Sequence, residues 1–280
     1  MEAASFALAV GCGAIIGLSL ALTGSGGTAL AVPLLMYGLK LSPHRAVCVS
    51  MVAVGSMALV GLLPKLRGKI VEVRTGLAMA AAGMMGAPVG TWMSRYLSEK
   101  WLLFLFAALM LFLAARLFAQ AAMNRTDMEA VCETGRQPRP GALVHLLQSR
   151  NSSAADDGFR RKLLVCGIGL FSGVLSGLTG VGGGIIIVPA MILLGMEIRK
   201  ATATSLLVVG LISVSATSSH FLAGQRVPLG TTLIFAFGAL LGLGAGTLWC
   251  NRISGPRLQQ SVAAAMIMMA GLMVSRGFGH

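Results

Sequence analysis

The sequence has little charge, and its charged residues are kept out of long apolar stretches. Of its 280 residues 56% are hydrophobic and 11% are charged, whereas about a quarter are charged in an ordinary soluble domain. No Asp, Glu, Lys or Arg occurs in residues 4–39, 46–63, 77–93 or 101–115. Such runs can cross a hydrocarbon core of about 30 Å as helices, the form in which lipid leaves no backbone amide unpaired. The composition excludes an ordinary soluble protein and predicts several transmembrane helices.

Acidic residues are scarcer than basic ones, with 9 Asp and Glu against 22 Lys and Arg, which gives a net charge of +13. Basic proteins can bind nucleic acid through its phosphates. Here the basic residues fall between apolar spans rather than on one amphipathic face, as expected for the cytoplasmic loops of a membrane protein. We therefore expect the lipid bilayer, and no nucleic acid, as a partner.

Ionisable side chains are missing from the middle of the predicted spans. Intramembrane charges usually mark proton relays and cation sites, so their absence disfavours a carboxylate-based proton pump or a divalent-cation carrier. The five cysteines form no CxxC pair and no cluster with His, so we predict no disulfide framework, no metal site and no cofactor. The first residues, Met1–Ala4, lack the basic region of a signal peptide, so the first apolar stretch is expected to belong to the mature fold.

An internal repeat is the strongest feature present. Residues 16–33 (IGLSLALTGSGGTALAVP) match residues 172–189 (SGVLSGLTGVGGGIIIVP) at a constant offset of 156 residues. After a one-residue shift Ala46 and Ser50 align with Ala201 and Ser205, and Gly86 and Gly242 align at the original offset. A series in register over most of each half predicts duplication of the whole unit, which is common in secondary transporters.

Each copy contains the same predicted elements, so we expect an all-α polytopic membrane protein of about eight long helices and two short, broken or re-entrant ones. The first repeat is assigned to residues 1–119, a flexible linker to 120–161 and the second repeat to 162–280. The short elements, about 28–39 and 184–196, are too short to span the core alone. The long elements are expected at about 4–22, 45–63, 75–93, 101–119, 162–178, 201–222, 229–249 and 257–275.

Loop charge predicts the orientation of these helices. If the first long helix and the short helix of each copy form an out-and-back pair, six of the 22 Lys and Arg residues lie on one side and sixteen on the other. If the pair makes a single crossing, the split is fourteen to eight. The positive-inside rule prefers the sharper asymmetry. We expect inverted copies, both termini outside and the linker in the cytoplasm.

The motif Thr-Gly-x-Gly-Gly occurs at Thr23–Gly27 and again at Thr179–Gly183. Closely spaced glycines break a helix, and the free N–H groups at the start of the next helix attract anions. Two inverted copies would bring two such termini together near the membrane midplane. The predicted anion site consists of Thr23, Gly24, Ser25, Gly26, Gly27, Thr28, Ser50, Thr179, Gly180, Gly182, Gly183, Gly184, Thr204 and Ser205.

Structural explanations compete with this site. Glycines can serve close helix packing, which we favour for Gly86, Gly90, Gly242 and Gly246 because they recur at helical spacing. Ser and Thr in membrane helices often bond to their own backbone, so the polar group Thr202, Thr204 and Ser205 fits either role. Rossmann and P-loop interpretations fail, because no strand precedes the glycines and no Gly-Lys-Ser/Thr follows them.

Three motifs, GLTGVGGGIIIVP (Gly177–Pro189), ALTGSGGTALAVP (Ala21–Pro33) and KATATSLLVV (Lys200–Val209), resemble the TauE/SafE sulfite exporter family. The resemblance covers nearly the whole chain apart from the linker. It implies a multi-pass permease of the bacterial inner membrane, not an enzyme, with sulfite, sulfoacetate or other organosulfonates as substrates. Thr28 stands where the second copy has Gly184, which puts equal roles for the two halves in doubt.

We therefore expect a transporter, favoured as an exporter, of a small sulfur-containing anion bound between the two glycine breaks. An interior-negative membrane drives an anion outward by about 2.3 kcal/mol per charge and 100 mV, so export needs no ionisable coupling residue. Two alternatives stay open: a redox or enzymatic component of sulfur metabolism using Cys48 or Cys166, and a cation carrier using broken-helix carbonyls. A homodimer is also left open.

Overall fold

The computed structural model describes residues 3–23, 27–68, 70–98, 101–112, 114–115, 157–222, 229–249, 264 and 266–271. Every regular element in these residues is helical. The chain runs through α1 (Ala3–Thr23), the 3-10 helix η1 (Gly27–Leu30), α2 (Ala31–Gly38), α3 (Pro43–Arg67), α4 (Val73–Tyr96), α7 (Asp157–Thr179), α8 (Gly184–Leu193), α9 (Ile198–Leu222) and α10 (Leu229–Trp249). Helical residues also cover Trp101–Phe112 and 266–271.

Three described helices are long and apolar enough to cross a membrane, namely Pro43–Arg67, Lys200–Leu222 and Gly230–Thr247. Shorter apolar helices cover Phe6–Ala21, Thr28–Gly38, Trp101–Phe112 and Leu163–Thr179. The all-helical class predicted from the sequence is confirmed, together with several apolar helices, of which three are long enough to span a membrane. The ten residues of α8 reach about 15 Å, which is half of a hydrocarbon core of about 30 Å.

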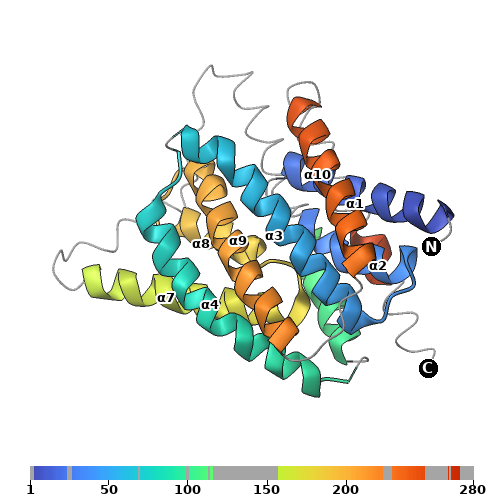
Figure 1. The fold of residues 1–280 in the computed structure, drawn as a ribbon. Coiled ribbons are helices and arrows are strands. Elements are labelled where there is room, and N and C mark those ends of the chain that lie inside the picture. The colour runs from blue at the N-terminus through green and yellow to red at the C-terminus, as the bar shows by residue number, and fades with distance from the viewer. Residues whose placement is uncertain are drawn as a thin grey trace.

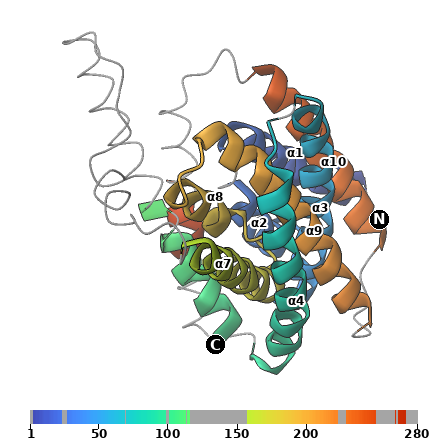
Figure 2. The same cartoon turned by 90° about the vertical axis from the view of Figure 1, so that its left-hand side faces the viewer.

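Two long helices, α3 and α9, pack against each other in the middle of the molecule (Figures 1 and 2). On one flank α1 packs on α10, and on the other α4 packs on α7. In Figure 1 helix α1 begins at the right of the molecule, and α7 begins at the left. Each flank therefore pairs one helix from the first half of the chain with one from the second.

Glycines allow α1 and α10 to cross at backbone distance. A Cβ atom on Gly17 would lie 1.9 Å from the carbonyl oxygen of Ala239, and one on Gly242 would lie 2.1 Å from that of Ala14. Lipid is as apolar as a leucine side chain, so helices in a membrane associate through close van der Waals packing, which small residues permit. The packing role predicted for Gly242 fits this contact.

The crossing of α4 and α7 uses the same positions 156 residues away. A Cβ atom on Gly173 would lie 2.1 Å from the carbonyl oxygen of Gly83, and one on Gly86 would lie 2.4 Å from that of Leu170. Gly90 approaches Val174 in the same way. The packing role predicted for Gly86 and Gly90 fits these contacts, and the two flanks share one construction.

Several helices extend beyond the apolar runs from which they were predicted. Helix α7 begins at Asp157, before the predicted start near residue 162, so the end of the segment expected to be a linker is helical. The hydropathy pattern marks only the apolar part of a helix, and residues 159–162 read Phe-Arg-Arg-Lys. The first short element is divided into a 3-10 turn and the eight-residue α2. The last expected helix, 257–275, is described only at residues 264 and 266–271.

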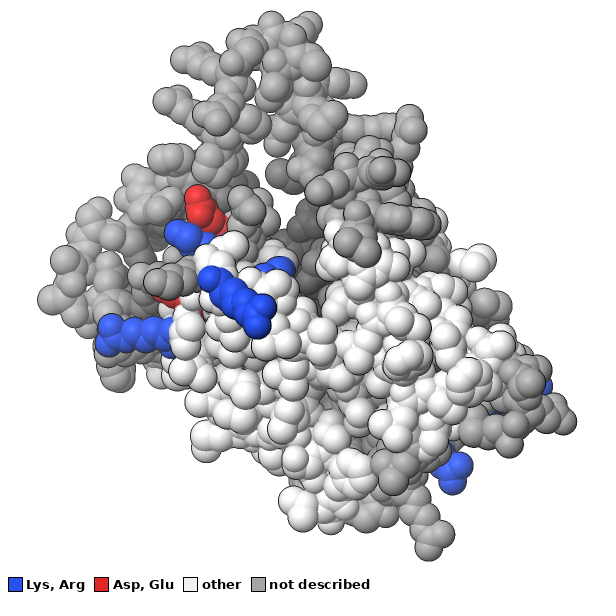
Figure 3. All heavy atoms as spheres, turned by 45° about the horizontal axis from the view of Figure 1, so that its top comes forward, with Lys and Arg blue, Asp and Glu red and all other residues white. Residues whose placement is uncertain are grey.

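Charged residues lie at the ends of the helices and leave a wide uncharged surface between them (Figure 3). The end of α3 carries Lys65 and Arg67, and the start of α9 carries Lys200, whose Nζ lies 3.5 Å from a Glu197 carboxylate oxygen. Exposed aromatic side chains, including Trp92, lie elsewhere on the surface. A polar rim and an apolar outer face suit a protein surrounded by lipid.

The substitution Gly17→Ala tests the crossing of α1 and α10. We expect a lower thermal unfolding midpoint of the purified protein in detergent, because overpacking costs about 1–3 kcal/mol and outweighs a gain in helix propensity of about 1 kcal/mol. Gly11→Ala, in the same helix but with no atom within 4 Å of the added Cβ, is the matched control and should unfold no earlier than the wild type. Equal midpoints for the two variants would contradict this packing.

Candidate functional site

The second glycine motif forms an unwound turn between α7 and α8, which we call the second break (Gly180–Gly183). Three of its residues have positive φ angles, 69° at Gly180, 76° at Gly182 and 63° at Gly183. Residues with a Cβ atom strongly disfavour this left-handed region, whereas glycine adopts it readily. A Cβ atom on Gly182 would also lie 2.7 Å from Cγ1 of Val54 in α3. Both the backbone conformation and the lack of space therefore require glycine here.

Hydroxyl groups from three separate segments bind the carbonyls of the second break. Ser50 of α3 donates to the Gly180 carbonyl at 3.0 Å, and Ser172 of α7 donates to the Gly183 carbonyl at 3.1 Å. Thr28 of η1 donates to the Val181 carbonyl at 3.0 Å across 153 residues of sequence. A carbonyl oxygen can only accept, so the hydroxyl must be the donor in each pair. The start of the first short element thus touches the second break directly.

Most amides of the same turn have no acceptor in the described part of the chain. The Gly180 N–H donates to the Ser176 carbonyl at 2.8 Å, but no described acceptor is bonded to the N–H groups of Val181, Gly182, Gly183 and Gly184, whereas Ile186 and Ile187 both donate to the Gly183 carbonyl. The first N–H groups of any α-helix lack intrahelical acceptors and carry partial positive charge. In a trans peptide N–H and C=O point in opposite directions, so the Gly184 amide points away from Ser172.

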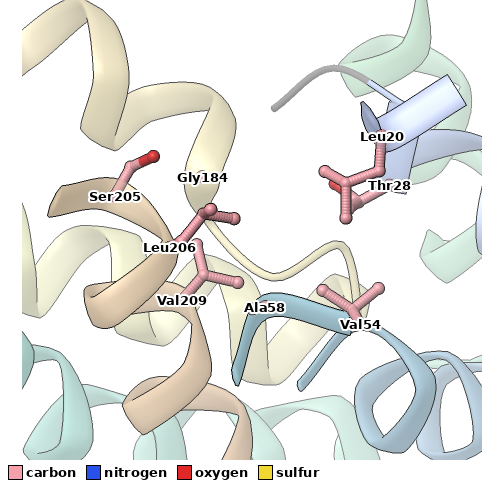
Figure 4. Close-up of a pocket in the computed structure, with 8 residues that line it drawn as sticks. All are labelled: Leu20, Thr28, Val54, Ala58, Gly184, Ser205, Leu206 and Val209. Carbon is pink, nitrogen blue, oxygen red and sulfur yellow. The ribbon is translucent and has the colours of Figure 1, made fainter. Parts of the chain in front are cut away.

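A small cavity lies where the two short elements begin, and we call it the central cavity (Figure 4). Its space amounts to about 260 Å³, including its open part. Four elements and the end of α1 contribute to it, and most of its surface is apolar. The lining residues are Leu20, Thr28, Val54, Ala58, Gly184, Ser205, Leu206 and Val209.

Two pairs of residues in this lining match the offset of the sequence repeat. Thr28 and Gly184 are separated by 156 residues, and Val54 and Val209 by the shifted offset of 155. Both members of each pair line the same space. Leu20 and Ser205 are present without their equivalents, Ser176 and Ser50, so the cavity is not symmetric throughout.

The predicted site residues are distributed unevenly around this cavity. Thr28, Gly184 and Ser205 line it, while Ser50 is joined to it through the Gly180 carbonyl. Thr179 and Gly183 line a second cavity on the far side of the break. Gly24, Ser25 and Gly26 lie outside the described residues, as do the side chain of Thr23 and the surroundings of Gly27.

Thr204 does not line either cavity. It is fully buried, and its Oγ1 accepts a 3.0 Å hydrogen bond from the backbone N–H of Glu72, at the start of α4. Consecutive residues of a helix are about 100° apart around its axis, so Thr204 faces α4 while Ser205 faces the cavity. Thr204 thus satisfies an amide at a helix N-terminus, a role that periodicity alone did not separate from substrate binding.

The hydroxyls expected to donate to an anion are already donating to the protein. Thr179 donates to Leu175 at 2.7 Å and Ser205 donates to Thr202 at 2.9 Å, each within its own helix. Ser50 shares its proton between Val47 at 2.8 Å and Gly180. In this conformation the free donors are therefore the amides of the second break rather than the predicted hydroxyls.

The anion site predicted from the sequence does not include Ser172 and Ser176, which precede the second break on α7. Both are fully buried, and Ser172 supports the break through the Gly183 carbonyl. Ser176 and Thr179 follow it at the i+4 and i+7 positions, which lie on one helix face. That spacing was the available signal, because a stripe of hydroxyls leading into a glycine break faces the break.

A profile of the sulfite exporter TauE/SafE family matches residues 9–273. The chain belongs to this family. The resemblance drawn from the glycine motifs is thereby confirmed, and the TauE/SafE chain is a membrane transporter rather than an enzyme.

Relatives of this TauE/SafE protein are bacterial. It is 28% identical over 272 residues to a probable membrane transporter protein of Xylella fastidiosa strain 9a5c, covering 96% of this chain and 94% of the relative. It is 26% identical over 231 residues to the probable membrane transporter protein YunE of Bacillus subtilis, covering 79% and 80%. No solved structure matches the chain.

The substitution Thr28→Val tests the contact between the first short element and the second break. It removes the donor to the Val181 carbonyl while nearly keeping the side-chain shape, and hydrogen bonds between membrane helices are worth about 0.6 kcal/mol on average and up to about 1.7. We expect a lower unfolding midpoint and faster hydrogen exchange at Ile186 and Ile187, whose amides donate to the Gly183 carbonyl of the break. Thr28→Ser should restore both values, whereas Ser218→Ala, at an exposed hydroxyl bonded within α9, should change neither.

Proposed function

We propose that this TauE/SafE transporter moves a small sulfur-containing anion, such as sulfite or an organosulfonate, through the central cavity. The substrate lies near the membrane midplane between the start of η1 at Thr28 and the start of α8 at Gly184. The observation that carries the proposal is the polarity of the second break. Three of its four carbonyls accept hydroxyl hydrogen bonds, while the N–H groups of Val181, Gly182 and Gly183 have no acceptor among the described residues.

This polarity favours an anion over a cation. A cation bound in a broken helix is coordinated by unwound carbonyls, whereas an anion is bound by half-helix N-termini. Hydroxyls from Ser50, Thr28 and Ser172 occupy the carbonyls of Gly180, Val181 and Gly183. Among the described residues only the Gly182 carbonyl of the turn lacks a hydroxyl donor, whereas the N–H groups of Val181, Gly182 and Gly183 have no acceptor. Donors that stabilise negative charge therefore predominate. Cation coordination would have to displace three buried hydrogen bonds.

Cavity size and lining further narrow the substrate class. In this conformation the central cavity has room for about one water molecule, so a substrate must be small and must move the lining side chains apart to enter. Removing water from an ion costs several kcal/mol, and each hydrogen bond to a charge returns about 1.5–3 kcal/mol. A few amide donors can offset that cost for a compact oxyanion with several acceptor oxygens, and apolar walls suit a sulfonate's carbon chain.

A thiol mechanism receives no support from the described cysteines. Cys12 and Cys48 are buried and Cys166 is exposed, and none of the three lines the central cavity. Cys48 lies two residues before Ser50 on α3, but the lining of the cavity on that helix begins at Val54. The transport role therefore stands without a nucleophile or a redox pair.

The proposed architecture is a pair of inverted repeats, supported by the equivalence of the two flanks. Gly17 and Gly173 occupy matching positions in the crossings of α1 with α10 and of α7 with α4. A two-fold axis through the central cavity would relate Thr28 to Gly184 and Val54 to Val209. Such repeats allow a transporter to expose one site alternately to the two sides of the membrane.

We place both termini outside and residues 120–161 in the cytoplasm of a bacterial cell with the protein in its inner membrane, from the distribution of basic residues. Whatever the orientation of the protein, an interior-negative membrane potential of about 100 mV favours export of an anion by about 2.3 kcal/mol per negative charge. Export would then need no coupling ion.

The substitution Gly182→Ala tests the site. It strains the backbone and places a Cβ 2.7 Å from Val54 Cγ1, so we expect flux of radiolabelled sulfite from proteoliposomes to fall at least ~10-fold, as for about 1.4 kcal/mol of lost stabilisation. Thiosulfate, methanesulfonate and acetate are compared in the same assay to define the substrate class.

Gly167→Ala is the matched control, since it adds the same atom to α7 with nothing within 4 Å. It should leave both flux and the unfolding midpoint unchanged. Wild-type flux in a folded, inserted Gly182→Ala protein would remove the site assignment.

An imposed membrane potential tests the direction of transport. Proteoliposomes made about 100 mV negative inside should lose a monovalent anion faster than proteoliposomes without a potential. At equilibrium its concentration outside should exceed that inside by up to about 50-fold, the equivalent of 2.3 kcal/mol. Collapsing the potential should abolish the accumulation. Efflux that follows a sodium gradient and ignores the potential would contradict uncoupled export.

A further inference from the structure

We infer that the transporter has a second anion site, which is formed by Ser176 and the second break on the side facing away from the central cavity. This inference rests on the proposed function, since it assigns a second position to the same substrate. The site lies in a separate cavity, the side cavity, of about 210 Å³ including its open part. It is lined by Leu109, Leu175, Ser176, Thr179, Val181, Gly183 and Ile186.

Ser176 is the unusual member of this lining. Its side chain is fully buried, and within the part of the chain that the structure describes its hydroxyl has no hydrogen-bond partner. A serine in a membrane helix commonly bonds to a carbonyl of the preceding turn, as Thr179 does with Leu175. A buried hydroxyl without a partner is unfavourable in an apolar interior. It is therefore held ready to donate to something that enters the side cavity.

The second break and the start of α8 connect the two cavities. Val181 and Gly183 line the side cavity, while Gly184, the first residue of α8, lines the central one. The Val181 carbonyl is bonded to Thr28, which lines the central cavity. The segment from Val181 to Gly184 therefore borders both spaces, and its N–H groups have no acceptor among the described residues.

The two cavities differ in a way that suits successive binding. The central cavity has Leu20 at the position where the side cavity has Ser176, 156 residues later. The hydroxyls facing the central cavity already donate to carbonyls, whereas that of Ser176 is free. In the central cavity an anion would be bound by backbone amides alone. In the side cavity it would be bound by backbone amides and by the Ser176 hydroxyl. A transport path needs such weak, repeated sites so that the ion can leave as well as enter.

Sulfite binding and flux test this site in wild-type and Ser176→Ala proteins. We expect about a ten-fold loss of flux, the effect of one hydrogen bond to a charged ligand, and a fall from two bound sulfites per chain to one in equilibrium dialysis. Ser218→Ala, which removes an exposed hydroxyl from α9, should retain wild-type flux and stoichiometry. A Ser176→Ala protein with wild-type flux and two bound sulfites would overturn the inference.

Cysteine labelling separates failure of this site from failure of the proposed function. In a background with the five native cysteines replaced, Ser176→Cys should react with the anionic reagent 2-sulfonatoethyl methanethiosulfonate, more slowly when methanesulfonate, an anion that does not attack the reagent, is present. The cationic 2-trimethylammonioethyl reagent should not react. Equal reaction with both reagents, or with neither, would overturn the second site. Absence of any anion flux in the wild type would overturn the proposed function, and anion-selective labelling would then still identify the side cavity.

Discussion

The structure depends on satisfying an unwound stretch of backbone inside an apolar interior. No lipid or water is available there to replace the hydrogen bonds that a helix normally makes, so the protein must supply them itself. It does so for the carbonyls, with hydroxyls of Ser50, Thr28 and Ser172 from three segments. These bonds hold the second break against α3, η1 and α7 at once, and they fix the positions at which the short helices begin.

The unequal treatment of carbonyls and amides determines the sign of charge that the break can bind. Had the hydroxyls been absent, the turn would present both donors and acceptors, and neither ion would be preferred. Because three of the four carbonyls are engaged, we expect the amides of Val181, Gly182 and Gly184, which have no acceptor among the described residues, to determine the local field. No ionisable side chain is needed for this effect, which agrees with the absence of charge from the middle of the apolar runs.

The sequence predicted the helices because hydropathy and glycine spacing are local properties, and α10 follows the expected range of 229–249. It predicted the importance of the breaks for the same reason. It could not separate Thr204 from Ser205, since both belong to one polar stretch and only packing against α4 shows which of them faces the cavity. It also could not show that the hydroxyls of Thr28 and Ser50 donate to carbonyls of the second break, because these partners lie 153 and 130 residues away in the sequence.

Alternating access, as proposed, links the crossings to the site. Helix α1 leads into the first short element and is packed against α10, while α7 leads into the second break and is packed against α4. Backbone-distance contacts at Gly17 and Gly173 leave little space between the two helices of each flank, so we expect each flank to move as a unit against α3 and α9. The bond from Thr28 to Val181 joins segments that belong to opposite flanks. A relative motion of the flanks would therefore change this bond, and with it the segment that borders both cavities.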